Sequence, residues 1–393
     1  MLKLMILIMM ISTTAHADNC TGPDATAQVQ TAIDTGTCLT PGTYFVDVPP
    51  LVNGRRRDSM LTGVHLCGAG AQRTTIMFRG DASMLYWAGF NVTTGAEPHD
   101  VRLSAACVTN SPEQSHLVRL WSATDNIRLH DLILENPRRS DGSEAGDCFN
   151  EVGAEPPYSS VNQVNHHLEI DHVIFNGCGR GGIHLARGVD DVNIHDNTFM
   201  GCAFDIGSES SGWADSSGVH RTVTNLRLSH NIFTSSTPGG YSLEMEWWGG
   251  ATLDHNFGDS RPLFSWYSDG LHFSYNDFTY RNVAAPTPVL DVQNTMHNFS
   301  SMYDTFTQYT NAAVMAVHPH DASYPSDFSN LMTTGATFTQ YGAGDFTTLT
   351  NVAGFTSSNA TLTYGGPTTR TPREMVTAGS SNVSTTGSVH VGF

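Results

Sequence analysis

One eight-residue pattern occurs five times between residues 165 and 280: LEIDHVIF (168–175), VNIHDNTF (192–199), LRLSHNIF (226–233), ATLDHNFG (251–258) and LHFSYNDF (271–278). Each copy opens with alternating apolar residues, continues with polar residues and usually ends in Asn and Phe. The copies start at uneven intervals of roughly 20 to 35 residues, the range of repeat architectures. The alternation predicts strands that bury one face.

A single strand of this kind cannot bury its apolar face alone, whereas stacked copies cover one another. Two residue types then fall in register, an amide and an aromatic ring: Asn197, Asn231, Asn256 and Asn276, and Phe175, Phe199, Phe233 and Phe278. Only Gly258 interrupts the aromatic register. The sequence therefore predicts an all-β, single-stranded parallel β-helix. A β-sandwich of short strands is the alternative, but it would not place Asn and Phe in one register.

The first 17 residues have the features of a secretory signal peptide. Lys3 supplies the charge, residues 4–11 are apolar, and Ala15-His16-Ala17 fits a cleavage site. We therefore expect a protein secreted to the periplasm or the extracellular space. No later apolar run is long enough to span a membrane.

The chain is strongly acidic, with a formal net charge of −18, and Lys3 is its only lysine. This balance argues against nucleic acid or an anionic membrane as a partner, because both attract basic surfaces. An anionic polymer would need a bridging metal or a local cluster of arginines.

Seven cysteines in an exported chain predict disulfide bonds. The best pair by register lies on consecutive copies of the repeat, and two further pairs are close in sequence. The expected pairs are Cys178–Cys202, Cys20–Cys38 and Cys67–Cys107, with Cys148 left over.

The N-terminal region predicts a short amphipathic helix over residues 24–35, which would cap the coil and protect its strand edges. It is followed by PGTYFV (41–46), GVHLCGAG (63–70) and RTTI (73–76). This order resembles the pectin-lyase-like superfamily of right-handed parallel β-helix proteins. The resemblance implies a right-handed coil. It also implies one of several activities, among them polysaccharide lyases, glycoside hydrolases, epimerases and adhesins. We predict one domain over residues 18–355, then a C-terminal cap or poorly ordered tail over 356–393.

A second strand follows each Asn-Phe turn, and its outward residues form a row. The row is expected to carry the catalytic and binding candidates His184, Asp205, Glu244, Glu246, Asp291 and Gln293. Four aromatic residues beside it suit sugar rings: Trp247, Trp248, Trp266 and Tyr267. The segments 137–166 and 207–221 are expected to form loops that wall the site.

Two mechanisms fit this row. In the first, Asp205, Glu244 and Asp291 bind Ca²⁺, and Arg180 or Arg187 acts as the base in β-elimination on a uronic-acid-containing polysaccharide. The second mechanism is glycoside hydrolysis by Glu244 and Glu246, about 7 Å apart by strand rise, a spacing that suits inversion. The frequency of lyases in the superfamily favours the first.

Two plainer interpretations, and one further resemblance, remain beside these mechanisms. A non-catalytic glycan-binding protein or adhesin would use the same face without turnover. The acidic row can also be a solvated surface. The sequence His318-Pro319-His320-Asp321 faintly resembles the Pro-His-Asp motif of alginate epimerases.

Overall fold

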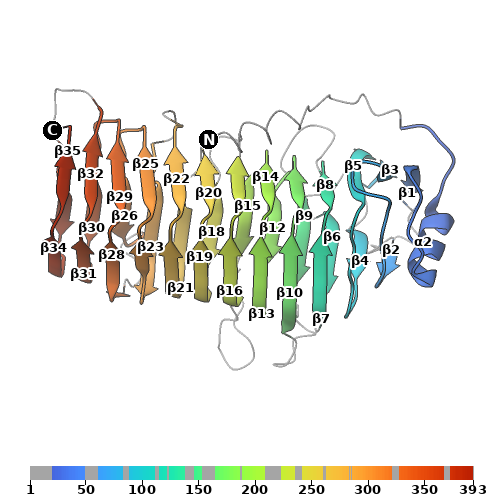
Figure 1. The fold of residues 1–393 in the computed structure, drawn as a ribbon, viewed down its shortest axis with the longest axis horizontal. Coiled ribbons are helices and arrows are strands. Elements are labelled where there is room, and N and C mark those ends of the chain that lie inside the picture. Colours follow the sequence, from blue (N-terminus) through green and yellow to red (C-terminus); the bar gives the residue numbers. More distant parts are fainter. Residues whose placement is uncertain are drawn as a thin grey trace.

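The structure is a computed structural model. It describes residues 20–48, 61–82, 88–110, 115–121, 124–137, 146–152, 164–185, 188–208, 223–234, 241–259, 263–282, 284, 286–320, 327–366 and 372–392. Its parallel strands stack into one long right-handed coil with a helix at the N-terminal end (Figure 1). The predicted fold class is therefore confirmed.

One face of the coil is a 13-stranded parallel sheet. Its strands, in spatial order, are β1 (Gly42–Asp47), β3 (Thr74–Asp81), β5 (Arg102–Thr109), β8 (Ile133–Glu135), β11 (Ile174–Asn176), β14 (Thr198–Met200), β17 (Ile232–Thr234), β20 (Phe257–Asp259), β22 (Asp277–Tyr280), β25 (Thr305–Gln308), β29 (Thr337–Gln340), β32 (Thr361–Tyr364) and β35 (Val389–Val391).

The other strands form a 22-stranded sheet that bends into two rows. The first row contains β2 (Leu61–Gly63), β4 (Ala88–Val92), β6 (His116–Trp121), β9 (Asp147–Val152), β12 (Gly181–Leu185), β15 (Phe204–Ser208), β18 (Leu243–Glu246), β21 (Leu263–Ser274), β23 (Leu290–His297), β26 (Met315–His318), β30 (Thr347–Thr350) and β33 (Met375–Ala378). The second contains β7 (Asp125–His130), β10 (Asn165–Asp171), β13 (Val189–His195), β16 (Val223–Ser229), β19 (Trp248–Asp254), β24 (Ser300–Met302), β27 (Asp327–Ser329), β28 (Leu331–Thr334), β31 (Ala353–Ser358) and β34 (Ser381–Thr386). Strand β21 runs through both rows, since it pairs with β18 and with β19.

The interior holds the predicted stack of phenylalanine rings. Ring centroids are 4.6 Å apart for Phe175 and Phe199, and 5.2 Å apart for Phe199 and Phe233. At Gly258 a Cβ would come within 2.5 Å of the Phe278 ring. The glycine thus leaves room for Phe278, which continues the stack at 6.5 Å from Phe233.

The predicted asparagine ladder also forms. The side-chain amide of Asn197 donates to Oδ1 of Asn231 at 3.0 Å, and the chain of bonds continues through Asn256 to Asn276. Its last acceptor is the carboxylate of Asp304, which the sequence analysis did not include. All of these side chains are buried, so the ladder satisfies polar groups that would otherwise lie unpaired in the interior.

Helix α2 (Thr26–Thr35) covers the N-terminal end of the coil, as predicted, and buries Val29 and Ile33. At the other end the strands continue past residue 355. Strands β32 to β35 occupy the segment that the sequence analysis assigned to a cap or poorly ordered tail. The coil therefore extends to Val391, because Ser and Thr residues fill strand positions that apolar residues hold elsewhere.

The disulfide bonds differ from the predicted pairs. Cysteines pair as Cys20–Cys107, Cys38–Cys67 and Cys148–Cys178, while the buried Cys202 takes part in none of these disulfides. Cys178 and Cys202 occupy the same register position on consecutive coils. Cys178 nevertheless forms its disulfide with Cys148 on β9, at a Cα separation of 5.4 Å. The segment before Cys148 does not show the repeat, so its position in the coil could not be read from the sequence.

The signal-peptide prediction falls on residues 1–17, outside the described residues. Within the part of the chain that the structure describes, no helix is long and apolar enough to cross a membrane.

Candidate active site on the stacked strands

The outward residues of strands β12 to β26 form the surface that we call the carboxylate face. Parallel pairing aligns these residues in two columns along the coil. The first column contains His184, Gly207, Glu244 and Asp291, and the second contains Glu246, Trp266, Gln293 and His318. Of these residues, the sequence analysis had placed His184, Glu244, Glu246, Asp291 and Gln293 on the row, and their functional roles stay predictions.

Glu244 and Glu246 lie at alternate positions of strand β18. Both are partly exposed, whereas Leu243, which precedes them, and Met245, which lies between them, are fully buried. A Cβ at Gly207 would come within 3.4 Å of Oε2 of Glu244 and 2.8 Å of the Phe204 ring. A glycine here leaves space for the carboxylate. The two side chains lie on the same face of the strand, and their Cα atoms are about 7 Å apart by strand rise.

Asp291 is held by two neighbours on the same face. Its Oδ1 lies 2.9 Å from Nε2 of His318, and its Oδ2 accepts a hydrogen bond from Gln293 at 3.0 Å. His318 also donates from Nδ1 to the Pro319 carbonyl at 2.8 Å. Hydrogen bonding to Asp291 raises the pKa of His318.

Tyr241 belongs to the same site, although the sequence analysis did not single it out. Burial, reinforced by the negative charges of Asp291 and Glu244, raises the pKa of Tyr241 to about 12. Its hydroxyl therefore stays protonated and can donate a hydrogen bond near these carboxylates. Tyr241 lies two residues before the start of β18, and no pattern in the sequence marks it.

Three of the four predicted aromatic residues form a partly exposed platform beside the carboxylates. The Trp247 and Tyr267 rings are stacked at 4.4 Å, and Trp266 stacks on His320 at 5.1 Å. His320 also contacts Oε1 of Gln293 through Nδ1 at 2.7 Å. Such a platform next to hydrogen-bonding groups suits the faces and hydroxyls of sugar rings.

Trp248 is not part of this platform. Only 1% of it is exposed, and its indole nitrogen donates to the hydroxyl of Ser208. The predicted substrate contact is wrong because Trp247 adopts a left-handed conformation (φ 60°). At this corner the alternation of inward and outward side chains shifts by one residue. Trp248 is the first residue of β19, and its side chain therefore points inward.

Asp205 is fully buried, and its predicted place on an exposed face is also wrong. The register of β12 and β15 places it opposite Gly182. A Cβ at Gly182 would meet the interior ring of Phe199 at 2.6 Å. Gly182 thus leaves room for the Phe199 ring. The predicted catalytic and metal-binding roles of Asp205 stay predictions.

Arg180 is held by a buried carboxylate at the N-terminal end of the face. Its Nε and Nη2 atoms lie 2.9 and 2.6 Å from the two oxygens of Asp147. Burial opposes ionisation of Asp147, but the charge and hydrogen bonds of Arg180 outweigh it and hold the pKa of Asp147 well below its usual range. A guanidinium bound in this way is unsuited to act as a base.

His184 and His116 surround the same carboxylate. His116 lies 3.0 Å from Asp147, and burial lowers the pKa of His116 to about 4. His184 contacts Asn150 and Arg180, both at 2.9 Å. These contacts fix the side chains at this end of the face.

Arg187 lies outside the described residues. So do most of the two predicted loops, at positions 138–145, 153–163 and 209–222. Their predicted roles stay predictions.

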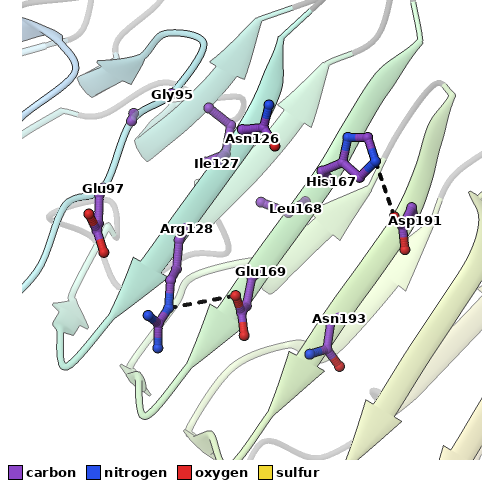
Figure 2. Close-up of a pocket in the computed structure, with 11 residues that line it drawn as sticks. Gly95, Glu97, Asn126, Ile127, Arg128, His167, Leu168, Glu169, Asp191 and Asn193 are labelled. Atoms are coloured by element: carbon purple, nitrogen blue, oxygen red, sulfur yellow. Dashed lines mark ion pairs between the residues drawn. The ribbon is translucent and has the colours of Figure 1, made fainter.

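A concave region lies on the neighbouring row, over β7, β10 and β13 (Figure 2). Its volume is about 430 Å³. Arg128 lies 3.7 Å from Glu169, and His167 lies 3.4 Å from Asp191, so its charges are largely paired. No Trp or Tyr lines it. The carboxylate face is therefore the better candidate for binding sugar rings.

The predicted Ca²⁺ ligands do not converge. Among the described residues, Asp205, Glu244 and Asp291 do not bring three ligand atoms within 4.8 Å of one another. Asp205 is buried and Asp291 is bound to His318. These residues do not fit the oxygen-rich shell that Ca²⁺ requires.

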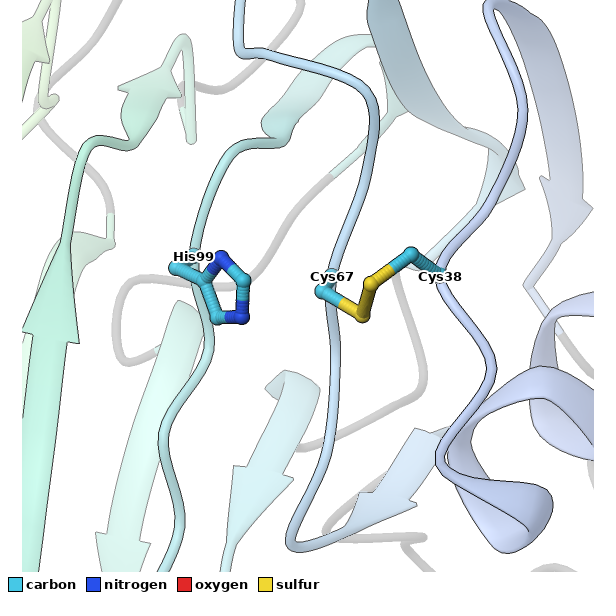
Figure 3. A group of neighbouring side chains, drawn as sticks. All are labelled: Cys38, Cys67 and His99. Carbon is cyan, nitrogen blue, oxygen red and sulfur yellow. A yellow bond between two sulfur atoms is a disulfide. The ribbon is translucent and has the colours of Figure 1, made fainter.

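Two other groups of described residues do bring three such atoms together. In the first, Cys38 and Cys67 form a disulfide beside His99, which leaves no thiolate for a metal (Figure 3). The second group is Glu169, Asp171 and His195. There the guanidinium of Arg128 already binds Asp171, at 3.0 Å.

The stack of coils, its amide ladder and its aromatic interior define the class of protein: the chain has the pectin-lyase-like right-handed β-helix fold. No model of a protein family matches the sequence, and a search of the curated proteins finds no relative. Solved structures do match.

The catalytic unit of a GH87 α-1,3-glucanase from Streptomyces thermodiastaticus matches with a TM-score of 0.55 at 12% identity, over 94% of this chain and 67% of the glucanase chain. The A-module of the Azotobacter vinelandii mannuronan C-5 epimerase AlgE4 matches with a TM-score of 0.48 at 12% identity, over 94% and 92%. The Streptococcus pneumoniae surface adhesin PfbA gives 0.47 at 10%, over 94% and 89%. At these identities the similarity shows the fold.

Proposed function

We propose that this protein is a glycoside hydrolase that cleaves a polysaccharide on the carboxylate face. The observation that carries the proposal is the pair of partly exposed carboxylates, Glu244 and Glu246, at alternate positions of β18. The platform of Trp247, Trp266 and Tyr267 lies beside them. The fold is shared with a GH87 α-1,3-glucanase and with a GH87 catalytic domain in complex with tetrasaccharides, which supports a carbohydrate substrate.

The neighbours of the two glutamates suggest their roles. The negative charges of Glu244 and Asp291 both contribute to the raised pKa of Tyr241. The two carboxyl groups therefore lie near the same hydroxyl. His318 lies 2.9 Å from Asp291. In general, a carboxyl group beside another carboxylate ionises less readily than one alone, which suits the role of a general acid. We assign the general acid to Glu244 and the general base to Glu246.

In the reaction, Glu244 donates its proton to the glycosidic oxygen as the bond to the anomeric carbon breaks. Glu246 takes a proton from a water molecule, whose oxygen bonds to the same carbon from the opposite side. A carboxyl separation of roughly 6.5–9.5 Å leaves room for this water and gives inversion. Tyr241 and Gln293 supply hydrogen bonds to the sugar hydroxyls.

The lyase that superfamily frequency favours finds less support. Its predicted base, Arg180, is bound by Asp147, and the predicted Ca²⁺ ligands do not converge. The acidic face would also repel a uronic acid polymer. Elimination therefore needs a base and a cation site from residues outside this set.

Substitution of the two glutamates tests the hydrolase directly. We expect Glu244→Gln and Glu246→Gln each to lower the release of reducing ends from a polysaccharide panel by about 10²- to 10⁴-fold, the range for loss of a general acid or base. Binding of the same polymer, measured by affinity electrophoresis, should be retained.

Glu169→Gln is the matched control, because Glu169 is a partly exposed glutamate on the neighbouring row. Its activity should equal that of the unmodified chain. Full activity in both carboxylate-face variants would overturn the proposal. Binding without products in every variant, the unmodified chain included, would identify a glycan-binding protein or adhesin.

A further inference from the structure

The concave region over β7, β10 and β13 is a groove that runs along the coil, and we call it the lateral groove (Figure 2). Parallel pairing aligns its side chains in two columns. The first column lies at the corner of the coil and contains Asn126, His167 and Asp191, all with left-handed backbone conformations. The second column lies two residues further along each strand and contains Arg128, Glu169 and Asn193.

The floor of the lateral groove is backbone. Between the two columns lie Ile127 and Leu168, whose side chains are buried inside the coil. At the N-terminal end of the groove lies Gly95, where a Cβ would meet no atom within 4 Å, so the groove is open at that end. Its volume of about 430 Å³ is in the range of ligand-binding sites.

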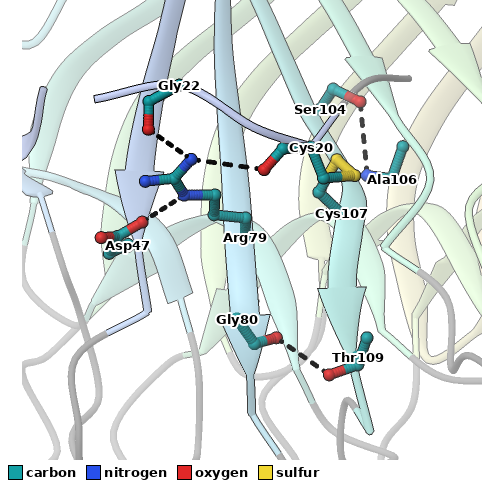
Figure 4. The surroundings of a disulfide bond; sticks show 9 residues. All are labelled: Cys20, Gly22, Asp47, Arg79, Gly80, Ser104, Ala106, Cys107 and Thr109. Atoms are coloured by element: carbon teal, nitrogen blue, oxygen red, sulfur yellow. Dashed lines mark hydrogen bonds and ion pairs between the residues drawn. A yellow bond between two sulfur atoms is a disulfide. The ribbon is translucent and has the colours of Figure 1, made fainter. Parts of the chain in front are cut away.

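The N-terminal wall of the groove, residues 95–97, is held in place. The backbone N–H of Arg128 donates to the carbonyl of Ala96 at 2.9 Å. The same segment leads into β5, where Cys107 forms its disulfide with Cys20 (Figure 4). The groove is therefore preformed, and a ligand would pay little to order it.

The lateral groove offers hydrogen-bonding groups that the described part of the protein leaves unused. The side-chain amides of Asn126 and Asn193 make no hydrogen bond to another described residue. The guanidinium of Arg128 binds Asp171 through Nε and Nη2, at 3.0 and 3.2 Å, while its Nη1 bonds to none of the described residues. Each amide can both donate and accept a hydrogen bond.

The charges of the groove disfavour an anion and do not build a cation site. Glu97 and Asp191 are exposed carboxylates, against the single guanidinium of Arg128. Among the described residues, no group of three metal-binding atoms within 4.8 Å includes Glu97 or Asp191. Glu169 is engaged by Nε2 of His195 at 3.2 Å, so we assign it no ligand contact. Dispersed amides and carboxylates suit hydroxyl groups, which a neutral sugar chain presents at every residue.

We propose that the lateral groove binds a strand of neutral polysaccharide at a site separate from the carboxylate face. The inference rests on the proposed function, because it concerns the polymer that this face cleaves. Successive residues of a column are about 4.8 Å apart, the spacing of stacked strands, which is close to the length of one sugar residue in an extended chain. Each coil thus meets the hydroxyls of one sugar. A long polymer held at two places has a raised effective concentration at the carboxylate face.

The double variant Asn126→Gly/Asn193→Ala tests this inference. It removes both amides, and glycine suits the left-handed conformation at position 126. Affinity electrophoresis in gels that contain a soluble glucan, mannan, galactan or xylan measures binding, with polygalacturonate as the anionic comparison. We expect at least one neutral polymer to retard the unmodified chain, and the double variant to bind that polymer about 5- to 10-fold more weakly.

Asn330→Gly/Thr356→Ala is the matched control. Asn330 is another corner residue with a left-handed conformation (φ 55°), and Thr356 is exposed on β31. This variant should be retarded like the unmodified chain. Circular dichroism of both variants confirms that they fold, so a change in retardation reports binding.

Reducing-end assays separate this inference from the proposed function. If both hold, the double variant cleaves the retarding polymer with a KM raised about 5- to 10-fold at unchanged kcat, and it cleaves short oligosaccharides of that polymer at the unmodified rate. Unchanged binding and KM in the double variant would overturn the inference and leave the hydrolase standing. Weakened binding without cleavage by any of the proteins would support the groove and overturn the hydrolase. Retardation by none of the neutral polymers, or by polygalacturonate alone, would also overturn the inference.

Discussion

Asp304 ends the buried amide ladder with a carboxylate instead of an amide. Its Oδ1 accepts from both the backbone and the side chain of Asn276, at 2.8 and 2.9 Å, and its Oδ2 accepts from Ser301 at 2.6 Å. Burial nevertheless raises the pKa of Asp304 to about 6. One residue in the ladder is therefore a proton-sensitive group in the interior.

This residue predicts a specific pH dependence of stability. The folded-state pKa is raised, so the native state binds more protons than the unfolded state between about pH 4 and pH 6. The contribution of Asp304 is present below about pH 4 and is lost as pH rises through about 6, by at most about 3 kcal/mol. Asp304→Asn should remove this part of the profile, so the variant gains stability relative to the unmodified chain as pH rises.

Urea unfolding of both proteins across this pH range measures the effect. In the difference between their free energies of unfolding, the contributions of all other titrating groups cancel. A constant difference from pH 4 to pH 7 would contradict the assignment to Asp304.

Single residues also set the limit of what alternation predicts at the site. The face positions of Glu244, Glu246 and Gln293 follow directly from the apolar pattern. Trp248 does not, because it follows a corner at Trp247 where the backbone changes phase, and the burial of Asp205 was not predicted either. The left-handed conformation of a Trp is rare, and nothing in the local sequence marks it.

At the scale of the element, the amide ladder links consecutive coils. Asn256 accepts the backbone N–H and the amide of Asn231 at 3.1 and 3.0 Å, and it donates to Leu228 and Asn276, both at 2.9 Å. Each coil is thus tied to both neighbours at one buried turn.

Removing one rung should be costly. Asn256→Ala leaves several buried polar groups without partners, at about 1–3 kcal/mol each. We expect a loss of about 3 kcal/mol or more in the free energy of unfolding, measured by urea denaturation. Asn193→Ala is the control, since Asn193 is partly exposed on β13 and lies outside the ladder, and it should change stability by less than about 0.5 kcal/mol. Equal effects of the two substitutions would show that burial of the ladder contributes little.

Elements were predicted well where the repeat is regular and poorly where it is not. The strands from Leu168 to Phe278 and the helix near residue 26 follow from periodicity. The disulfides do not, because Cys148 pairs with Cys178 across a segment that breaks the repeat. The strands after residue 355 lie in the segment predicted as a C-terminal cap or poorly ordered tail, because their Ser- and Thr-rich sequences show only a weak apolar pattern.

At the scale of the whole molecule, a rigid acidic coil carries one face with accessible carboxylates and a partly exposed aromatic platform. The interior stack and the ladder fix the spacing between coils, and this spacing sets the distance between Glu244, Trp266 and Asp291. The net charge of −18 favours a neutral polymer over an anionic one. Fold and charge together restrict the substrate class, while the face determines the chemistry.

Proton NMR of polysaccharide digests, recorded from the first minutes of reaction, tests the central claim most directly. It reports the appearance of new anomeric protons, their configuration and any vinyl protons in one spectrum. If the protein is an inverting glycoside hydrolase, we expect new reducing ends of inverted configuration and no vinyl signals. A chelator should not change this result. Vinyl signals that a chelator abolishes would contradict it and establish a metal-dependent lyase, and products of retained configuration would contradict the roles given to Glu244 and Glu246.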